Sequence, residues 1–180
     1  ESCGMGITSI LGNTSLINKV YVPKYIYPVT RVLSSSINML FSMVPLLLVI
    51  LLTRTAITPA ILLLPFSLAC LICFCTGMVL VLSASMVFFR DTQFLWNVLS
   101  MIWMYATPIF YPESIIPARF LAIYKLNPLY HFIRFARTVI MDGISPEPKA
   151  YLICLMFAVG SLVIGGLIFR KMQDKFVLYI

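Results

Sequence analysis

Residues 88–117, FFRDTQFLWNVLSMIWMYATPIFYPESIIP, decide how this chain folds. The stretch begins at a charged pair, Arg90 and Asp91, and continues without charge until the proline breaks at Pro108 and Pro112. A helix rises 1.5 Å per residue, so residues 93–111 cover about 27 Å, close to the hydrocarbon thickness of a bilayer. The stretch therefore predicts a membrane-spanning helix over residues 93–111.

One face of this predicted helix is mostly polar along its whole length. Its members recur every three or four residues and are Gln93, Asn97, Ser100, Met104, Thr107 and Tyr111. Lipid does not favour such a stripe, so we expect it to face protein or water. A second stripe with this spacing comes earlier, at Arg31, Ser35, Asn38 and Ser42. Its Ser and Asn side chains either line a path with the first stripe or make hydrogen bonds between helices.

The composition places the whole chain in a membrane. Of 180 residues, 61% are hydrophobic and 11% are charged, and the mean hydropathy is +1.01. A soluble domain is nearer half apolar and a quarter charged. We expect an all-α integral membrane protein with a single transmembrane domain over residues 1–180. Its four transmembrane helices are predicted at residues 32–52, 57–88, 93–111 and 151–169.

The charges fit this placement. The net charge of +7 suits anchoring at anionic headgroups, and the basic residues are scattered between the spans, which argues against nucleic-acid binding. An even number of spans puts both termini on one side. Positive charges next to the spans, at Arg31, Arg90, Arg170 and Lys171, favour the cytoplasmic side for the termini and for the tail 170–180.

Residues 1–28 are too polar to span a membrane. The cluster Asn13-Thr14-Ser15 is typical of a helix N-cap and predicts a short helix of about two turns after it. Two interpretations remain open. The segment is either a surface connector or a docking helix whose Leu16, Ile17 and Val20 insert into a partner while Lys19 stays in water.

Residues 113–149 are the least membrane-like part between the last two spans. Asn127 followed by Pro128 predicts a helix start, and Asp142-Gly143 predicts its end. We expect an amphipathic helix that lies in an interface or forms part of a re-entrant hairpin. Its apolar face is predicted as Leu129, Phe132, Ile133, Ala136 and Ile140. Its other face is predicted as Tyr130, His131, Arg134, Arg137, Thr138 and Met141.

Small residues recur every three or four positions in two of the predicted spans. They are Ala69, Cys73 and Gly77 in one span, and Ala158, Ser161 and Gly165 in the other. Such faces allow membrane helices to approach closely. The cysteines at positions 70, 73 and 75 have no His or carboxylate near them in sequence, so they are interpreted as ordinary packing residues.

The residues give little support to catalysis or to an energy source within this chain. The four predicted spans contain no internal carboxylate, Lys or Arg, which ion-coupled carriers generally need. The chain has no P-loop signature, and its single histidine, His131, is interpreted as an interfacial residue. We expect neither an enzyme nor a bound cofactor or metal. A transport path lined by the two polar stripes would then either conduct passively or be driven by a partner protein.

The ordered set of motifs resembles a known family. NTSLINKVYVPKYIYPVTRVLSSSIN, FFRDTQFLWNVL, TPIFYPESIIP, LNPLYHFIRFAR and a final span with a short basic-aromatic tail follow one another as in ABC-2 type permeases. The likeness is strongest to the branch that exports polysaccharide and teichoic acid, and it covers essentially all 180 residues. Family members usually have an interface helix and two further spans before this point. The resemblance therefore implies a permease without about its first third.

The resemblance also implies partners and residue roles. The family exports lipid-linked glycan across the cell inner membrane as a dimer of multi-pass permeases with two ATP-binding subunits. The coupling region would be Asn13, Leu16, Ile17, Lys19 and Val20, and the cytoplasmic mouth Arg90 and Asp91. The extracellular exit hairpin, from Phe110 to Gly143, would use Asn127, Arg134 and Arg137. The translocation path would comprise Ser35, Asn38, Ser42, Gln93, Asn97, Ser100, Trp103, Thr107, Phe110 and Tyr111.

Three alternatives remain. The substrate could be a drug or a lipid, since ABC-2 permeases vary, or the chain could be a membrane scaffold or regulator that transports nothing. Trp96 and Trp103 could also face lipid or the membrane interface rather than a path.

Overall fold

The computed structural model describes residues 1–13, 22–52, 58–109 and 124–176, and the regular structure in these ranges is entirely helical. The elements are α1 (Ser2–Ile7), η1 (Leu11–Asn13), α3 (Ile26–Leu52), η2 (Pro59–Leu63), α4 (Leu64–Phe88), α5 (Thr92–Tyr105), α7 (Pro128–Arg137), the π-helical η4 (Thr138–Asp142) and α8 (Pro148–Gln173). The predicted all-α class is confirmed for this part of the chain.

Three of these segments are long and apolar enough to cross a membrane: Ile26–Leu52, Pro59–Phe88 and Pro148–Gln173. They correspond to the spans predicted at 32–52, 57–88 and 151–169. The first begins six residues earlier than predicted, because Pro28 lies in the first turn, where the missing N–H costs no hydrogen bond. Pro45 lies within this helix, as expected from the sequence.

The span predicted at 93–111 is shorter as a helix. α5 has 14 residues and ends at Tyr105, so it covers about 21 Å, less than the hydrocarbon thickness. The prediction of helix over residues 106–109 is wrong. Pro108 disfavours helical geometry at the residue before it, and Thr107 already lies outside the helix. Phe110 and Tyr111 lie outside the described residues.

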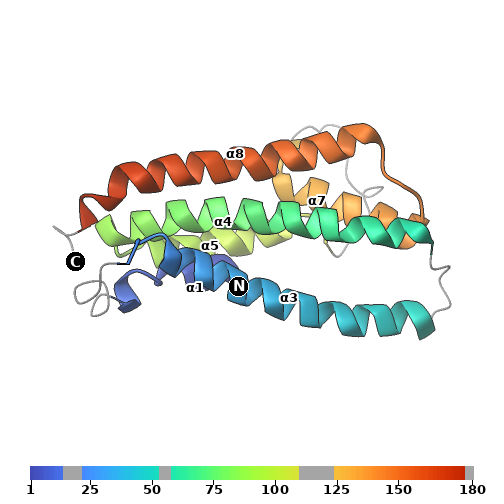
Figure 1. The fold of residues 1–180 in the computed structure, drawn as a ribbon, viewed down its shortest axis with the longest axis horizontal. Helices are drawn as coiled ribbons and strands as arrows, with labels where there is room; N and C mark the ends of the chain where they lie inside the picture. Colours follow the sequence, from blue (N-terminus) through green and yellow to red (C-terminus); the bar gives the residue numbers. More distant parts are fainter. Residues whose placement is uncertain (14–21, 53–57, 110–123, 177–180) are drawn as a thin grey trace.

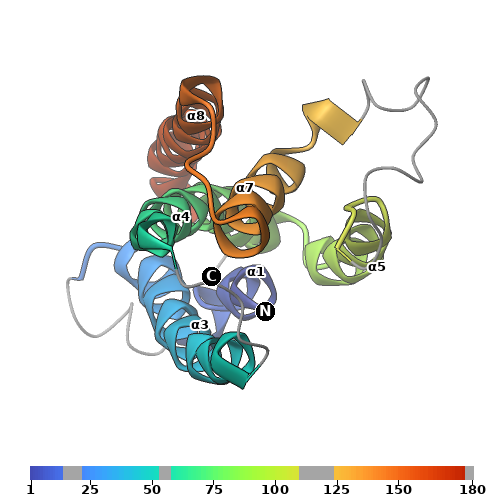
Figure 2. The same cartoon turned by 90° about the vertical axis from the view of Figure 1, so that its right-hand side faces the viewer.

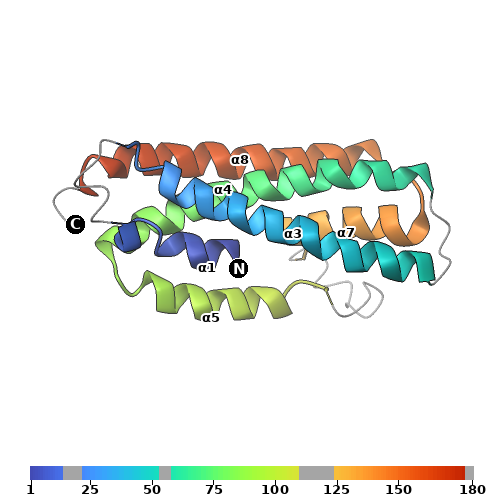
Figure 3. The ribbon, with the colours of Figure 1, turned by 60° about the horizontal axis from the view of Figure 1, so that its bottom comes forward.

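The helices form an elongated bundle with α4 in the middle. α3 and α8 flank α4 along its length (Figure 1). α5 runs in the same direction as α3, opposite to α4 and α8 (Figure 3). Seen along the bundle, α5 stands apart from α4, and α1 lies between α3 and α5 (Figure 2).

The tightest helix contact joins α4 to α8 through the two small-residue faces. Gly77 is packed so closely against the Ser161 backbone that a Cβ at this position would overlap its carbonyl group. A Cβ on Gly165 would overlap the Gly77 carbonyl in the same way. Ser161 Oγ also donates a hydrogen bond of 3.0 Å to the carbonyl oxygen of Phe74. These contacts confirm both faces as packing surfaces and show that they pair with each other.

The N-terminal residues are part of the bundle, which the sequence did not indicate. Ile7 and Ile10 are fully buried, and Gly6 packs directly against the side chain of Val79 in α4. The chain starts about halfway along the bundle and α1 runs from there towards the end where α8 stops (Figure 1). Residues 2–13 are therefore a packed element of the fold rather than a surface connector.

The helical stretch formed by α7 and η4 starts and ends where the sequence predicted, although its last turn is π-helical. The Asn127 side chain accepts a hydrogen bond of 3.1 Å from the Leu129 N–H, and Gly143 adopts a left-handed conformation with φ of 64°. The predicted faces are only partly correct. Phe132 is buried as expected, but the other buried side chains are Tyr130, Phe135 and Val139. The cause is that α7 packs against both α4 and α8, so it buries a wider surface than one stripe.

Candidate functional site

The C-terminal end of α5 is tied to the start of α7 by a small hydrogen-bond network. Trp103 Nε1 donates to Asn127 Oδ1 at 2.8 Å, and Asn127 Nδ2 donates to Thr107 Oγ1 at 2.9 Å. Thr107 Oγ1 in turn donates to the Trp103 carbonyl oxygen at 2.7 Å. One asparagine side chain thus caps α7 and binds two residues of the segment that leaves α5.

Arg137, at the other end of α7, binds the same segment. Its Nη2 donates to the carbonyl oxygens of Pro108 at 3.1 Å and Ile109 at 3.4 Å. These carbonyls follow the end of α5 and have no helical partner, so a guanidinium is a suitable donor for both. We call Trp103, Thr107, Asn127 and Arg137 the α5–α7 clasp. It fixes the chain that leaves α5 against both ends of α7.

The clasp changes how two predicted path residues are understood. The Thr107 side chain is 1% exposed, and its hydroxyl both donates and accepts within the clasp. The indole N–H of Trp103 is bound to Asn127, and its ring packs edge-on against Trp96 at a centroid distance of 6.1 Å. Thr107 is therefore buried within the clasp, and Trp103 is half-buried beside it.

The polar stripe of α3 borders a cavity at mid-height in the bundle. Ser35, Asn38 and Ser42 line a cavity of about 310 Å³ that lies between α3, α4 and the start of α1. The Ser42 hydroxyl donates to the Asn38 carbonyl oxygen at 3.0 Å, so its lone pairs remain available as acceptors. The fourth predicted member, Arg31, does not line this cavity.

An acidic residue that the sequence analysis did not single out lines the same cavity. Glu1 and Ser2 of the N-terminal segment line it, opposite Ile72 and Cys75 of α4. No carboxylate was expected at this depth because the predicted spans contain none. Two apolar residues three positions apart, Ile7 and Ile10, anchor this segment between the helices, since both are fully buried.

The polar stripe of α5 does not meet that of α3 in the described residues, because α1 lies between the two helices (Figure 2). Asn97 is exposed, and Gln93 and Ser100 are half-buried. Ser100 Oγ donates to the Asn97 carbonyl oxygen at 3.0 Å. The bundle-facing side of α5 is instead formed by Thr92 and Trp96. The two stripes are therefore separate surfaces in one copy of the chain.

The remaining predicted site residues lie at the ends of the bundle. Arg90 and Asp91 are exposed in the turn between α4 and α5. Asn13 closes η1 and donates from Nδ2 to the Ser9 carbonyl oxygen at 2.7 Å. The other coupling residues, Leu16, Ile17, Lys19 and Val20, lie outside the described residues.

A cavity of about 480 Å³ lies between α7 and the start of α8, and Arg134 and His131 line it. The His131 ring stacks on Phe157 at a centroid distance of 5.7 Å, and its Nε2 is 2.7 Å from the Lys125 carbonyl oxygen. These contacts pack His131 of α7 against α8 and the residues before α7. Among the residues that the structure describes, no group of three or more His, Cys, Asp or Glu is arranged to hold a metal ion.

The chain is similar to one protein family and to three named relatives. Residues 5–141 match the ABC-2 type transporter family. An O-antigen export system permease protein, RfbA, of Klebsiella pneumoniae is 28% identical over 98% of this chain and 68% of its own length. A second Klebsiella pneumoniae protein of that name is 25% identical with the same coverage. The namesake from Myxococcus xanthus is 27% identical over 97% of this chain and 68% of its own length.

Proposed function

This chain belongs to the ABC-2 type transporter family, and we propose that it is the permease subunit of an ATP-driven exporter of a lipid-linked polysaccharide or teichoic-acid-like polymer. It is a multi-pass protein of the cytoplasmic membrane. The observation that carries the proposal is the similarity of almost the whole chain to permeases named for O-antigen export. The polar stripe of α3 supports the proposal, because it lines a cavity and a sugar chain needs uncharged donors and acceptors along its route.

The proposed topology has four spans and an exit hairpin. α5 and the residues after it, to position 111, form the third span, and residues 113–149 form a hairpin on the extracellular side. Residues 1–13 run inside the bundle towards the cytoplasmic side. The rest of the coupling region, to position 28, and the tail 170–180 face the cytoplasm, with Arg90 and Asp91 at the cytoplasmic mouth. The alternating directions of α3, α4, α5 and α8 support this arrangement (Figure 3).

The proposed path uses both polar stripes and ends at the hairpin. Ser35, Asn38 and Ser42 bind sugar hydroxyls on one wall. Gln93, Asn97 and Ser100 bind them from α5, and this stripe faces the same stripe of a second copy of the chain across the path in a homodimer. The aromatic side chains of Phe110 and Tyr111 lie at the exit. Arg134 lines the cavity under α7, and it lies beside the exit in this proposal.

The proposed energy source is a separate ATP-binding subunit. The chain has no P-loop signature, so hydrolysis takes place on the partner. Leu16, Ile17 and Val20 insert into that subunit, while Asn13 and Lys19 border the contact. If Leu16→Asp combined with Ile17→Asp left co-purification of the ATP-binding subunit and export unchanged, this coupling assignment would be wrong.

Surface glycan measures the transport function directly. The test uses cells that lack their own export permease and express this permease, its ATP-binding subunit and the glycan synthesis enzymes. Asn38→Leu and Asn97→Leu are expected to reduce surface polymer several-fold while lipid-linked glycan accumulates inside, because each removes a hydrogen-bonding group from the path. The matched control is Leu40→Ala, which changes the side of α3 opposite the stripe.

Three results would argue against the proposal. A permease for drugs or small lipids would change resistance or lipid distribution and leave the surface polymer as it was. A scaffold would tolerate both asparagine substitutions. An equal loss with Leu40→Ala would mean that general damage to α3, rather than loss of the path, explains the phenotype.

A further inference from the structure

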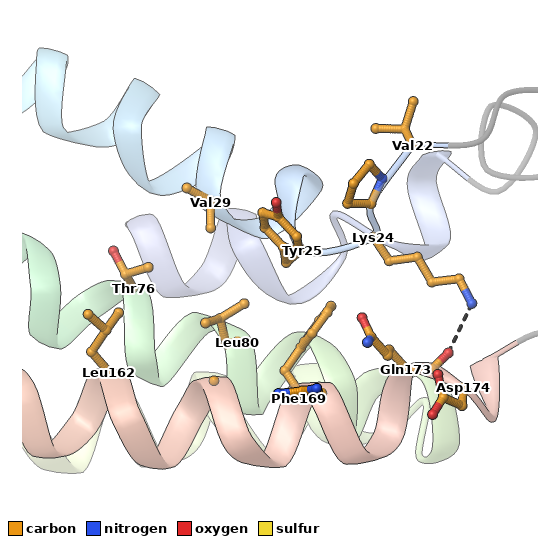
Figure 4. A pocket seen from close by; sticks show the side chains of 13 residues that line it. Val22, Lys24, Tyr25, Val29, Thr76, Leu80, Leu162, Phe169, Gln173 and Asp174 are labelled. Atoms are coloured by element: carbon orange, nitrogen blue, oxygen red, sulfur yellow. Dashed lines mark hydrogen bonds between the residues drawn. The ribbon is translucent and has the colours of Figure 1, made fainter.

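A third cavity, larger than the two already described, lies between helices other than α5. Its volume is about 620 Å³, and it opens between the start of α3, the second half of α4 and the last turns of α8 (Figure 4). α8 and α5 lie on different sides of α4 (Figure 2). The cavity therefore belongs to a different surface of the bundle from the stripe on α5, and its occupant does not depend on the proposed glycan substrate.

The cavity extends over the depth of one leaflet. Its inner end is bordered by Thr76 and Leu162, close to the middle of α4 and α8, and its outer end by Asp174, just after α8. The twelve helical steps from Leu162 to Asp174 correspond to about 18 Å. One leaflet contributes about 15 Å of hydrocarbon, so the cavity reaches from the bilayer middle to the headgroups.

The inner part of the cavity is apolar and has room for a chain of methylenes. Leu80, Val29 and Phe169 border it together with Gly166 (Figure 4). Gly166 has open space where a side chain would start, since no atom lies within 4 Å of a Cβ placed there. This differs from Gly165, which is pressed against α4. The gap at Gly166 is therefore a void on the cavity wall rather than a packing contact.

The outer part of the cavity is charged. Lys24 Nζ donates to the Gln173 carbonyl oxygen at 2.9 Å and lies 5.5 Å from the centre of the Phe176 ring. An ammonium group has three N–H donors, so this bond leaves two for an anion. The exposed guanidinium of Arg170 is on the same rim, and Asp174 is the carboxylate there. Two cations against one carboxylate give the rim a net positive charge.

We propose that this cavity binds an anionic phospholipid of the surrounding bilayer. One acyl chain occupies the space beside Gly166 and Leu162, and the phosphate binds Lys24 and Arg170. Basic pockets between membrane helices are suited to anionic headgroups, and a lipid places its phosphate and its chain at the two depths where this cavity is basic and apolar. The bound lipid also joins α3 to the end of α8, the two helices that the Lys24 bond connects.

Native mass spectrometry of the purified full-length permease, depleted of lipid and then titrated with phosphatidylglycerol, tests the proposal. Gly166→Leu fills the void and is expected to weaken phosphatidylglycerol binding at least tenfold. Gly160→Leu is the matched control on α8, since it too enters open space but does not line the cavity, and it is expected to bind as the unaltered protein does. Arg170→Gln is expected to weaken binding by about fivefold, the usual effect of one basic residue near an anionic membrane.

Several results would overturn the proposal. Equal binding by the Gly166→Leu and Gly160→Leu variants would mean that only non-specific lipid around the protein is detected. Displacement of phosphatidylglycerol by inorganic phosphate in millimolar excess would mean that the acyl chain is not held. Displacement by an equimolar polyprenyl phosphate would assign the cavity to a carrier lipid instead. A thermal midpoint measured for each variant separates lost binding from lost folding.

Discussion

One residue, Asn127 at the start of α7, fixes the end of α5 against the bundle. The Asn127 side chain makes three hydrogen bonds. Its Oδ1 accepts from the Trp103 indole N–H and the Leu129 backbone N–H, and its Nδ2 donates to the Thr107 hydroxyl. An N-cap contributes about 1 kcal/mol, and a buried donor left without a partner costs about 1–3 kcal/mol. The Asn127 side chain therefore contributes more to stability than a helix cap alone would.

Asn127→Ala is expected to lower the free energy of unfolding by about 2–4 kcal/mol, because it removes the cap and leaves the Trp103 indole N–H unpaired. The measurement is the thermal midpoint of the purified protein in detergent. Asn97→Ala serves as the control, because Asn97 is exposed on α5, and a change there is expected to stay within about 0.5 kcal/mol. Equal shifts for the two variants would contradict the role of the clasp.

The site shows what residue-level reasoning from sequence can reach. The cap at Asn127 was predicted because it depends only on neighbours in the chain. The bond from Asn127 to Trp103 spans 24 positions, so no local pattern contains it. For the same reason Thr107 was assigned to the path from its spacing, whereas the fold buries it in the clasp.

At the scale of elements, the α4–α8 pair determines the core of the bundle. Membrane helices gain little from the hydrophobic effect within lipid, so close backbone packing at Gly77 and Gly165 has to supply much of the attraction. The spacing of small residues identified each face. It could not identify the partner, because Ala69, Cys73 and Gly77 would suit any neighbouring helix with a similar face.

Gly77→Leu is expected to disrupt this helix pair, since its Cβ would overlap backbone atoms of Ser161 that cannot rotate away. Overpacking of a core commonly costs about 1–3 kcal/mol, and a backbone clash belongs at or above the upper end. The amount of folded protein in the membrane and its thermal midpoint should both fall. Gly160→Leu, which enters open space on α8, should leave both near the original values. A comparable fall in the two variants would point to general intolerance of bulk rather than to this contact.

The ends of elements and the packing of short ones were harder to predict. Hydropathy continues past Tyr105, so it gave no reason to stop α5 there, and the stop depends on the turn before Pro108. α1 has six residues, too few for periodicity to be informative. Its burial comes from the fit of Gly6 to Val79, which is a property of the assembled bundle.

Ile10→Asp tests whether the N-terminal element is part of the core. Ile10 is fully buried, so a carboxylate there loses its hydration without a partner, and severe loss of folded protein is expected. Gly12→Asp places the same charge two residues away at an exposed position with open space, and it should be tolerated. A folded, thermally unchanged Ile10→Asp protein would show that residues 2–13 are dispensable for the bundle. Protease resistance in detergent gives an independent readout of the same difference.

At the scale of the whole molecule, one copy of the chain leaves the polar stripe of α5 without a protein surface to face. Asn97 is exposed on a helix whose neighbouring side chains Phe94, Leu95 and Val98 are apolar and also exposed. Lipid accommodates the apolar side chains but not a polar stripe, so we infer that the stripe faces a second copy across the proposed path. This arrangement would bring two chains to one route, with one α5 stripe from each.

Cross-linking distinguishes this dimer from a monomer with a lipid-facing stripe. The five native cysteines at positions 3, 70, 73, 75 and 154 are replaced, and a single cysteine is introduced at Ser100. A short bis-maleimide is expected to give a covalent dimer in native membranes, because symmetry places the two Ser100 positions opposite each other. Val163→Cys, on the exposed side of α8, is the control and should stay monomeric. Dimers formed equally from both positions would reflect random collision. Dimers from position 163 alone would place the interface on α8 and contradict the inferred contact between the α5 stripes.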